Sequence, residues 1–149
     1  MILIPESVEA EIRSHVEKGY PHEAAGFLLG HERDGKRFIE VVLPQTNTFE
    51  KQHRRRRYLI EAEAMMAAED YADQHGYEIL GIFHSHPDHP PEPSTYDLER
   101  ALPFFSYLIT SVINGVAVTS RCWRLNDDRS SFDEERIDPI ETLKTTPRS

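Results

Sequence analysis

The sequence predicts an α/β (α+β) fold in which helices pack on a mixed β-sheet. Two segments with helical periodicity, 5–18 and 61–75, alternate with short apolar runs that are typical of buried strands. The dipeptides Asp34-Gly35 and Asn114-Gly115, one toward each end of the chain, are strong hairpin signals. A chain of 149 residues is long enough for one domain with a substantial core.

The first helix is predicted from its apolar spacing. Val8, Ile12 and Val16 recur every four residues among charged ones, so one stripe faces the core. Gly19 is typical of a residue that ends a helix, and a buried, glycine-bounded strand is expected over 24–30.

The next part of the chain predicts a hairpin and then a loop. The strand over 24–30 turns at Asp34-Gly35 into an Ile- and Val-rich strand over 37–43. Residues 44–52 are polar and turn-like. Residues 54–60 mix four arginines with strand-forming residues, and their secondary structure is left open.

The middle of the chain predicts a second helix and a third strand. Residues 61–75 are rich in alanine and methionine, and Gly76 follows as a stop signal. An apolar strand is expected over 77–83, and a short helix over 94–102 is ended by Pro103.

The last part predicts a second hairpin and the limit of the domain. Apolar runs over 104–113 and 116–125 form the hairpin, and 132–137 is expected to add an edge strand. We therefore expect one domain over 1–137 and a flexible tail over 138–149.

The composition limits the classes of function. The 26 acidic and 17 basic residues give a formal net charge of −9, which opposes binding to nucleic acid phosphates. No apolar run approaches the ~20 residues that span a bilayer, so no membrane partner or signal segment is expected. The single cysteine, Cys122, cannot form an intrachain disulfide, which favours a cytoplasmic protein. The oligomeric state is left open.

The stretch 81–97 carries the candidate chemistry. It runs from an apolar strand through His84 and His86 into a proline-rich loop that ends at Ser94 and Asp97. Alternate residues of a strand point to the same face, so the two histidines can present their imidazoles to one ion. Asp97 is a candidate third ligand, because imidazole and carboxylate groups suit zinc and a catalytic zinc keeps its fourth position open.

Other interpretations of these residues remain open. Ser94 and Asp97 also fit a capping box, in which Ser94 caps a helix and Asp97 reaches back. Glu23, at the entrance of a buried strand, can be a solvated cap of the preceding turn. His89 ranks next as a ligand, because its loop can fold back. The remaining alternative ligands are Asp88, His22 and His53.

The candidate residues resemble the JAMM motif of the JAB1/MPN/Mov34 metalloenzymes. They are Glu23, then His84-Ser85-His86-Pro87, then Ser94-x-x-Asp97 after seven residues that follow His86. The similarity covers most of the chain and fades after about residue 125. The resemblance implies a curved, mixed sheet of the MPN/JAB (cytidine-deaminase-like) core and a compact, single-domain bacterial member.

This resemblance implies a zinc-dependent peptidase or isopeptidase with one Zn²⁺ per chain. His84, His86 and Asp97 are implied as the metal ligands, with a water in the fourth position. Glu23 is implied as the base that moves a proton from this water to the leaving amine. Ser94 is implied as the donor to the developing oxyanion.

The resemblance also implies a partner, a small ubiquitin-like sulfur-carrier protein that ends in Gly-Gly. Its tail is expected to add as a strand at the sheet edge beside the proline-rich loop. We expect Arg55, Arg57 and Tyr58 to contribute to substrate binding, because alternate arginines of a strand can meet an acidic carrier or its carboxylate. A solvated edge strand guarded by charge is the alternative. The competing functions are a metal-free MPN scaffold and a JAMM peptidase with another peptide target.

Overall fold

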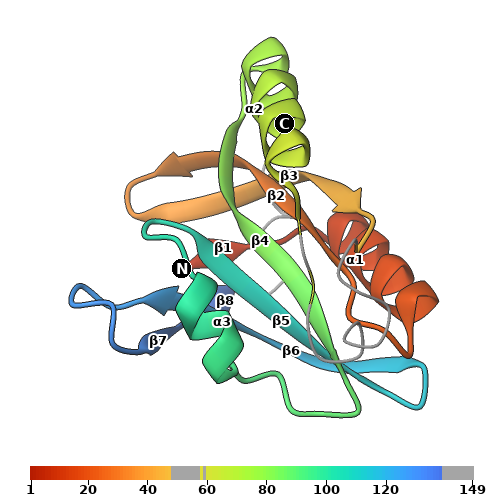
Figure 1. Ribbon diagram of the computed structural model, residues 1–149. Coiled ribbons are helices and arrows are strands. Elements are labelled where there is room, and N and C mark those ends of the chain that lie inside the picture. The colour runs from red at the N-terminus through yellow and green to blue at the C-terminus, as the bar shows by residue number, and fades with distance from the viewer. Residues whose placement is uncertain (48–57, 59, 139–149) are drawn as a thin grey trace.

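The computed structural model describes residues 1–47, 58 and 60–138. Within them, one eight-stranded sheet has the order β7-β6-β5-β4-β2-β3-β1-β8 (Figure 1). Its strands are β1 (Ile2–Leu3), β2 (Ala25–Arg33), β3 (Lys36–Gln45), β4 (Glu78–Pro87), β5 (Ser106–Ile113), β6 (Val116–Leu125), β7 (Phe132–Glu135) and β8 (Ile137–Asp138). The helices are α1 (Glu6–Gly19), α2 (Ala62–His75) and α3 (Thr95–Arg100).

The sheet is mixed, as the sequence predicts. β4 and β5 run parallel, as do β1 and its two neighbours, and the other pairs are antiparallel. Both predicted hairpins form. Their central residues have the left-handed φ angles that such tight turns require, 53° and 76° at Asp34-Gly35 and 52° and 84° at Asn114-Gly115.

Helices cover both faces of the sheet. On one face, α1 buries its predicted apolar stripe, including Ile12, in a cluster that contains Phe83 of β4. On the other face, Ala68 and Ala72 of α2 pack in a second cluster with Ile82 of β4. Among the described helices, none has the length and apolar content to cross a bilayer.

Strand β4 lies in the middle of the sheet and carries the site. It is flanked by β2 and β5, and it continues beyond its predicted end at Phe83 to Pro87. His84 and His86 are therefore residues of a central strand and are 1% and 7% exposed. Because both neighbours fix this strand, the two imidazoles have a rigid base.

The end of the domain differs from the expectation. The predicted edge strand over 132–137 is two strands at opposite edges of the sheet, since β7 pairs with β6 whereas β8 pairs with β1. The chain crosses between them at Arg136, whose carbonyl accepts a hydrogen bond from the N–H of Ile2 at 2.9 Å. Asp138 is buried in β8, so the folded domain includes one residue that we assigned to the tail. Residues 139–149 lie outside the described part.

Candidate metal centre

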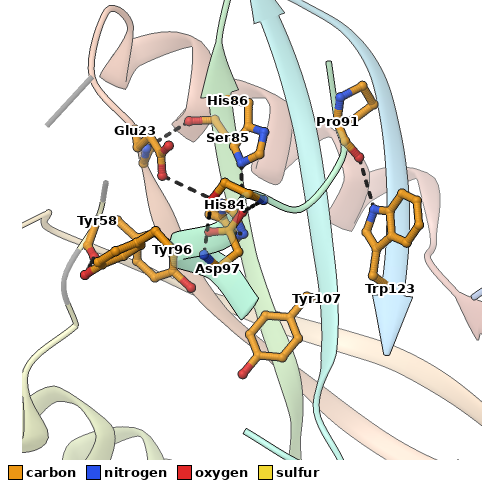
Figure 2. Close-up of polar contacts among 12 residues, drawn as sticks. Glu23, Tyr58, His84, Ser85, His86, Pro91, Tyr96, Asp97, Tyr107 and Trp123 are labelled. Atoms are coloured by element: carbon orange, nitrogen blue, oxygen red, sulfur yellow. Dashed lines mark hydrogen bonds and ion pairs between the residues drawn. The ribbon is translucent and has the colours of Figure 1, made fainter. Parts of the chain in front are cut away.

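Three buried side chains converge where β4 meets α3. His84 and His86 project from the same face of β4, and Asp97 lies in the first turn of α3 (Figure 2). One potential ligand atom from each residue lies within 4.8 Å of the others. His86 Nε2 is 3.1 Å from Asp97 Oδ2, and His84 Nε2 is 3.8 Å from Asp97 Oδ1. The structure therefore brings together the three predicted ligands.

The capping-box interpretation of Ser94 and Asp97 also holds. Asp97 N–H donates to the Ser94 hydroxyl at 3.1 Å, and Ser94 N–H donates to Asp97 Oδ2 at 2.9 Å. The two interpretations are compatible, because the cap holds the carboxylate in the orientation in which it faces both histidines. The hydroxyl oxygen of Ser94 accepts one bond in the cap, so its O–H proton stays available to a second partner.

The proline-rich loop after β4 orients His86. His86 Nδ1 lies 3.0 Å from the carbonyl oxygen of Pro90. A carbonyl only accepts, so Nδ1 carries the proton and Nε2 presents its lone pair in the neutral ring. The loop itself is anchored on the sheet, since Trp123 Nε1–H donates to the Pro91 carbonyl at 3.0 Å and the Ser111 hydroxyl donates to the His89 carbonyl at 2.6 Å.

Glu23 reaches the same place from the loop between α1 and β2. Its Oε1 lies 3.8 Å from His84 Nδ1, and the residue is 4% exposed. Ser85 fixes the neighbouring Ala24 twice, because its hydroxyl accepts from Ala24 N–H and its own N–H donates to the Ala24 carbonyl, both at 2.9 Å. Asn47 Nδ2–H donates to the Glu23 carbonyl at 2.8 Å. Glu23 is thus placed by its backbone.

The two carboxylates have opposite electrostatics. Burial, followed by the negative charge of Asp97, raises the pKa of Glu23 to about 9. Burial also opposes ionisation of Asp97, but the rings of His84 and His86 beside it and the N–H of Ser94 together hold its pKa well below its usual range. Burial lowers the pKa of His84 to about 4, so its imidazole is neutral at pH 7, the form that binds metals.

The hydrogen bonding of these residues fits a metal ion. Both ring nitrogens of His84 and Oε1 of Glu23 are buried and have no hydrogen-bond partner. In the tautomer that the Pro90 carbonyl selects, the Nε2 lone pair of His86 faces a carboxylate oxygen of Asp97 at 3.1 Å, and two acceptors at this distance need a proton or metal ion between them. Two imidazoles and one carboxylate form a donor set that suits zinc.

The alternative ligands lie elsewhere. Asp88 accepts hydrogen bonds from the Tyr20 hydroxyl at 2.7 Å and from Asn114 N–H at 3.0 Å, which braces the loop. The side chain of His89 is exposed, and its carbonyl accepts a hydrogen bond from the Ser111 hydroxyl of β5. His22 is half-buried next to Glu23 in the chain and does not join the ligand cluster, and His53 lies outside the described residues.

The predicted substrate-binding residues divide in two. Arg55 and Arg57 lie outside the described residues, so their role stays a prediction. The ring of Tyr58 packs against the ring of His84, with centroids 4.7 Å apart, and burial raises its pKa well above the usual value. Tyr58 therefore supports a candidate ligand as well as lying beside the site.

Supporting residues were the main omission of the sequence analysis. The roles of Ser85, Asn47 and Trp123 had no pattern that could reveal them, because each contacts a backbone group distant in sequence. The carbonyl of Pro90 is invisible for the same reason. Together these contacts leave a cleft of about 370 Å³ at the mouth of the site, whose lining includes Glu23, His86, His89, Pro90, Glu92 and Ser94.

Comparison with known proteins assigns the family. Residues 5–126 match the model of the prokaryotic homologs of the JAB domain. The chain belongs to this family. A JAB1/MPN domain protein from Archaeoglobus fulgidus shares the JAB fold, with a TM-score of 0.55 over 93% of this chain and 98% of that chain at 15% identity. The predicted fold class is thereby confirmed.

Other relatives of this JAB domain are closer in sequence. A Salinibacter ruber protein is 39% identical, with a TM-score of 0.71 over 90% of this chain and 88% of that chain. A Thermus thermophilus protein named "Probable TtuB-protein conjugate cleaving protease" is 28% identical over 109 residues, 73% of this chain and 69% of that protein. A Haloferax volcanii protein named "Desampylase" is 31% identical over 105 residues, 67% of this chain and 73% of that protein.

These relatives and the His-His-Asp cluster identify the JAB domain as an enzyme. It is a hydrolase, a metallopeptidase of the JAMM type. The prediction of this family from the motif is confirmed. The identity of the metal, the roles of single residues and the substrate are matters of proposal.

Proposed function

We propose that the protein is a zinc-dependent isopeptidase that hydrolyses an amide bond at the C-terminus of a small ubiquitin-like sulfur-carrier protein ending in Gly-Gly. The observation that carries this proposal is the convergence of Glu23 on His84, with Oε1 3.8 Å from Nδ1, beside the cluster that His84 forms with His86 and Asp97. A ligand cluster alone can be structural, whereas a buried carboxylate beside it, with one oxygen that makes no hydrogen bond, fits a proton-transfer role.

The metal would be held by His84, His86 and Asp97, one zinc per chain. Bound there, zinc supplies a Lewis acid that lowers the pKa of a water toward neutrality and a positive charge that favours the ionised form of Glu23. The Pro90 carbonyl keeps His86 in the tautomer that presents Nε2, and the Ser94 cap keeps the Asp97 carboxylate facing both rings.

Glu23 and Ser94 would carry the proton and charge movements. Glu23 accepts a proton from the attacking water and returns it to the nitrogen of the scissile amide as that bond breaks. Both residues line the same cleft, so one bound peptide can reach the two groups. The Ser94 O–H, which the cap leaves available, donates a hydrogen bond to the oxyanion that develops on the scissile carbonyl oxygen.

We propose a route for the substrate tail other than strand addition at the sheet edge. β4 is flanked by β2 and β5, so a tail cannot pair with the strand that carries the ligands. The open edge beside the loop is the half of β6 over 116–121, since β7 pairs only with Cys122–Leu125 among the described residues. That edge lies two strands away, ~10 Å from β4. We therefore assign the tail to the cleft, where Glu23 and Ser94 lie.

The supported partner class is the ubiquitin-like modifier. The relatives whose names state a substrate cleave a TtuB-protein conjugate or are called desampylases. A cleft lined by proline, glutamate and histidine side chains is open enough for an extended, glycine-rich peptide. The complete ligand set of His84, His86 and Asp97 does not favour a metal-free scaffold. A JAMM peptidase with another peptide target would use the same chemistry.

Metal analysis tests the first half of the proposal. The purified protein loaded with zinc is expected to hold about one zinc per chain, a value that follows from a single site. Changing His84, His86 or Asp97 to Ala should remove this zinc, whereas His89→Ala should retain it. Zinc binding that survives all three ligand changes would contradict the assignment.

Hydrolysis tests the second half. Glu23→Gln is expected to keep zinc and to lower kcat by ~10²–10⁴-fold, the usual contribution of a general base. Glu69→Gln, an exposed change on α2, is the matched control and should leave kcat unchanged. The probe is a Gly-Gly-ending ubiquitin-like protein with a fluorescent lysine linked through its ε-amino group. Zinc-loaded wild-type protein that releases no lysine would contradict the substrate class.

A further inference from the structure

The turn between α3 and β5 exposes apolar side chains that the fold does not use. Phe104 is 82% exposed and Leu102 is 43% exposed, on either side of Pro103. Phe104 has a φ of 74°, in the left-handed region that bulky residues rarely adopt. Strain of this kind persists where the surrounding structure holds the residue, and it is concentrated at binding sites. We call residues 102–104 the 102–104 turn.

The fold fixes this turn at both ends. Ala101, directly before the turn, is 4% exposed, and Ser106, which follows it after Phe105, is 0% exposed. Between them, Leu102 N–H donates to the hydroxyl of Tyr107 at 2.6 Å. The backbone conformation of the turn therefore sets the outward orientation of Phe104, and its side chain is already exposed in the free protein.

Continuous side chains join the turn to the candidate metal centre. A pocket of about 170 Å³ lies between them, and its lining includes Leu102, Tyr96 and Tyr58. Figure 2 shows Tyr58 and Tyr96 side by side, next to His84 and Asp97. The Tyr96 hydroxyl lies 3.5 Å from the Tyr58 carbonyl, and the Tyr58 ring packs on His84. Leu102 of the turn thus borders the same pocket as the two tyrosines beside the site.

The spacing suits a protein that reaches the metal centre through a short tail. Ile109 pairs with His84 across β4 and β5, and Phe104 precedes Ile109 by five residues. At the rise of a strand this corresponds to roughly 17 Å. An extended tail of about five or six residues covers that length.

We propose that the 102–104 turn is a docking surface for the folded body of the ubiquitin-like protein whose tail reaches the metal centre. The proposal rests on the proposed function and adds the surface by which the enzyme recognises the carrier. Arg100 lines the same pocket, with its guanidinium 5.2 Å from the ring centre of Tyr96. The chemistry that fits is an apolar patch with acidic residues at its rim, placed near the root of the tail.

The test compares a protein probe with a peptide probe that contains the same bond. The protein probe is a Gly-Gly-ending ubiquitin-like protein with a fluorescent lysine on its last carboxyl group. The peptide probe consists of its last six residues with the same lysine. Phe104→Gly removes the apolar ring and also relieves the left-handed φ, so the fold is expected to remain at least as stable.

For Phe104→Gly we expect KM for the protein probe to rise about tenfold, the usual loss at a central contact, with kcat within twofold. The peptide probe should be cleaved as by the wild type. Val118→Ser is the matched control. Val118 is a residue of β6 that is 55% exposed next to α1, so this change should leave the cleavage of both probes unaffected. Phe104→Tyr should restore most of the wild-type KM.

The possible results separate the two proposals. If KM for the protein probe is unchanged in Phe104→Gly, or if the peptide probe suffers equally, the docking surface is wrong while the proposed function stands. The docking surface is also contradicted if the wild-type enzyme cleaves the peptide probe with the same KM as the protein probe. If the wild type cleaves neither probe, the proposed function fails, and the partner assigned to the surface fails with it. Wild-type self-association that Phe104→Gly abolishes, with KM unchanged, would assign the turn to a second copy.

Discussion

Two buried glutamates show how differently one side chain behaves in two parts of the same domain. Glu135 of β7 is 8% exposed and accepts hydrogen bonds from Ser106 Oγ at 2.7 Å and Arg124 Nε at 3.1 Å. Burial opposes its ionisation, yet these bonds lower its pKa. Glu23 is 4% exposed, its Oε1 has no hydrogen bond, and burial followed by the negative charge of Asp97 raises its pKa to about 9. Burial is similar, so the partners make the difference.

The contrast extends to the neighbours of each glutamate. Around Glu135 the protein supplies its own partners, and Arg37 Nη1 donates to the Leu80 carbonyl at 2.7 Å and to Ser106 Oγ at 3.1 Å. Around Glu23, the nitrogens of His84 have no such bonds. A satisfied buried network stabilises the fold, whereas an unsatisfied one is completed from outside the chain. This difference separates the structural cluster from the candidate site.

The same substitution at the two positions should have opposite effects on stability. Glu135→Gln is expected to lower the free energy of unfolding by about 2–3 kcal/mol, below the range for fully buried pairs because Arg124 is partly exposed. Urea unfolding monitored by circular dichroism measures the loss, and zinc content should stay at the wild-type level. A change within ~0.5 kcal/mol, as for an ordinary surface residue, would contradict the structural role of Glu135.

Glu23→Gln should stabilise the metal-free protein at pH 8, by about 1–2 kcal/mol, because it removes a carboxyl group that is buried beside the negative charge of Asp97 and whose Oε1 makes no hydrogen bond. The measurement is the same urea titration in the presence of a chelator. Glu69→Gln, an exposed change, serves as the control and should leave the unfolding free energy unchanged. Destabilisation by Glu23→Gln would mean that Glu23 has partners that stabilise it.

The pH dependence of the metal-free protein should also differ between the two positions. The pKa of folded Glu23 is about 9 against 4.5 for the free side chain, so ionisation of the unfolded state favours unfolding as pH rises from 4.5 to 9. The advantage of Glu23→Gln should grow across that window, by at most about 1.4 kcal/mol per pH unit. Glu135 has a lowered pKa, so its contribution is present above pH 4.5 and lost on acidification. Parallel curves for both variants would contradict the contrast.

Ser85→Ala tests the support of Glu23 and should have the smallest effect. It leaves the Ala24 N–H without its side-chain acceptor and is expected to cost about 1 kcal/mol. Because Glu23 directly precedes Ala24 in the chain, kcat should fall several-fold while zinc binding is kept. Ser120→Ala, which removes a hydroxyl contact to Thr110 on the same face of the sheet as Ser85, should preserve kcat. Equal kcat losses in both variants would show that the effect is not specific to Glu23.

Local signals predicted most of the fold. The apolar spacing of α1, the glycine after α2 and the two hairpin dipeptides each determine a structure within a few residues, and each forms as expected. The split of 132–137 into β7 and β8 could not be predicted, because β8 pairs with the N-terminal β1. Two-residue strands carry no periodicity, and only long-range pairing defines them.

The candidate site divides along the same line. Strand alternation suffices to place His84 and His86 on one face, and the helix start suffices to bring Asp97 forward. Glu23 lies some sixty residues earlier, and only the family resemblance connected it to the histidines. Its position depends on the hydrogen bonds between Ala24 and Ser85, a contact between β4 and the segment before β2 that no local pattern encodes.

The part of the proline-rich loop that orients His86 is held by main-chain oxygens. The carbonyls of His89, Pro90 and Pro91 contact Ser111, His86 and Trp123. The exposed side chain of His89 can therefore vary without loss of the bonds that orient the ligand. Substitutions at such a position, in nature or in directed evolution, can thus change substrate preference while the orientation of the ligand is kept.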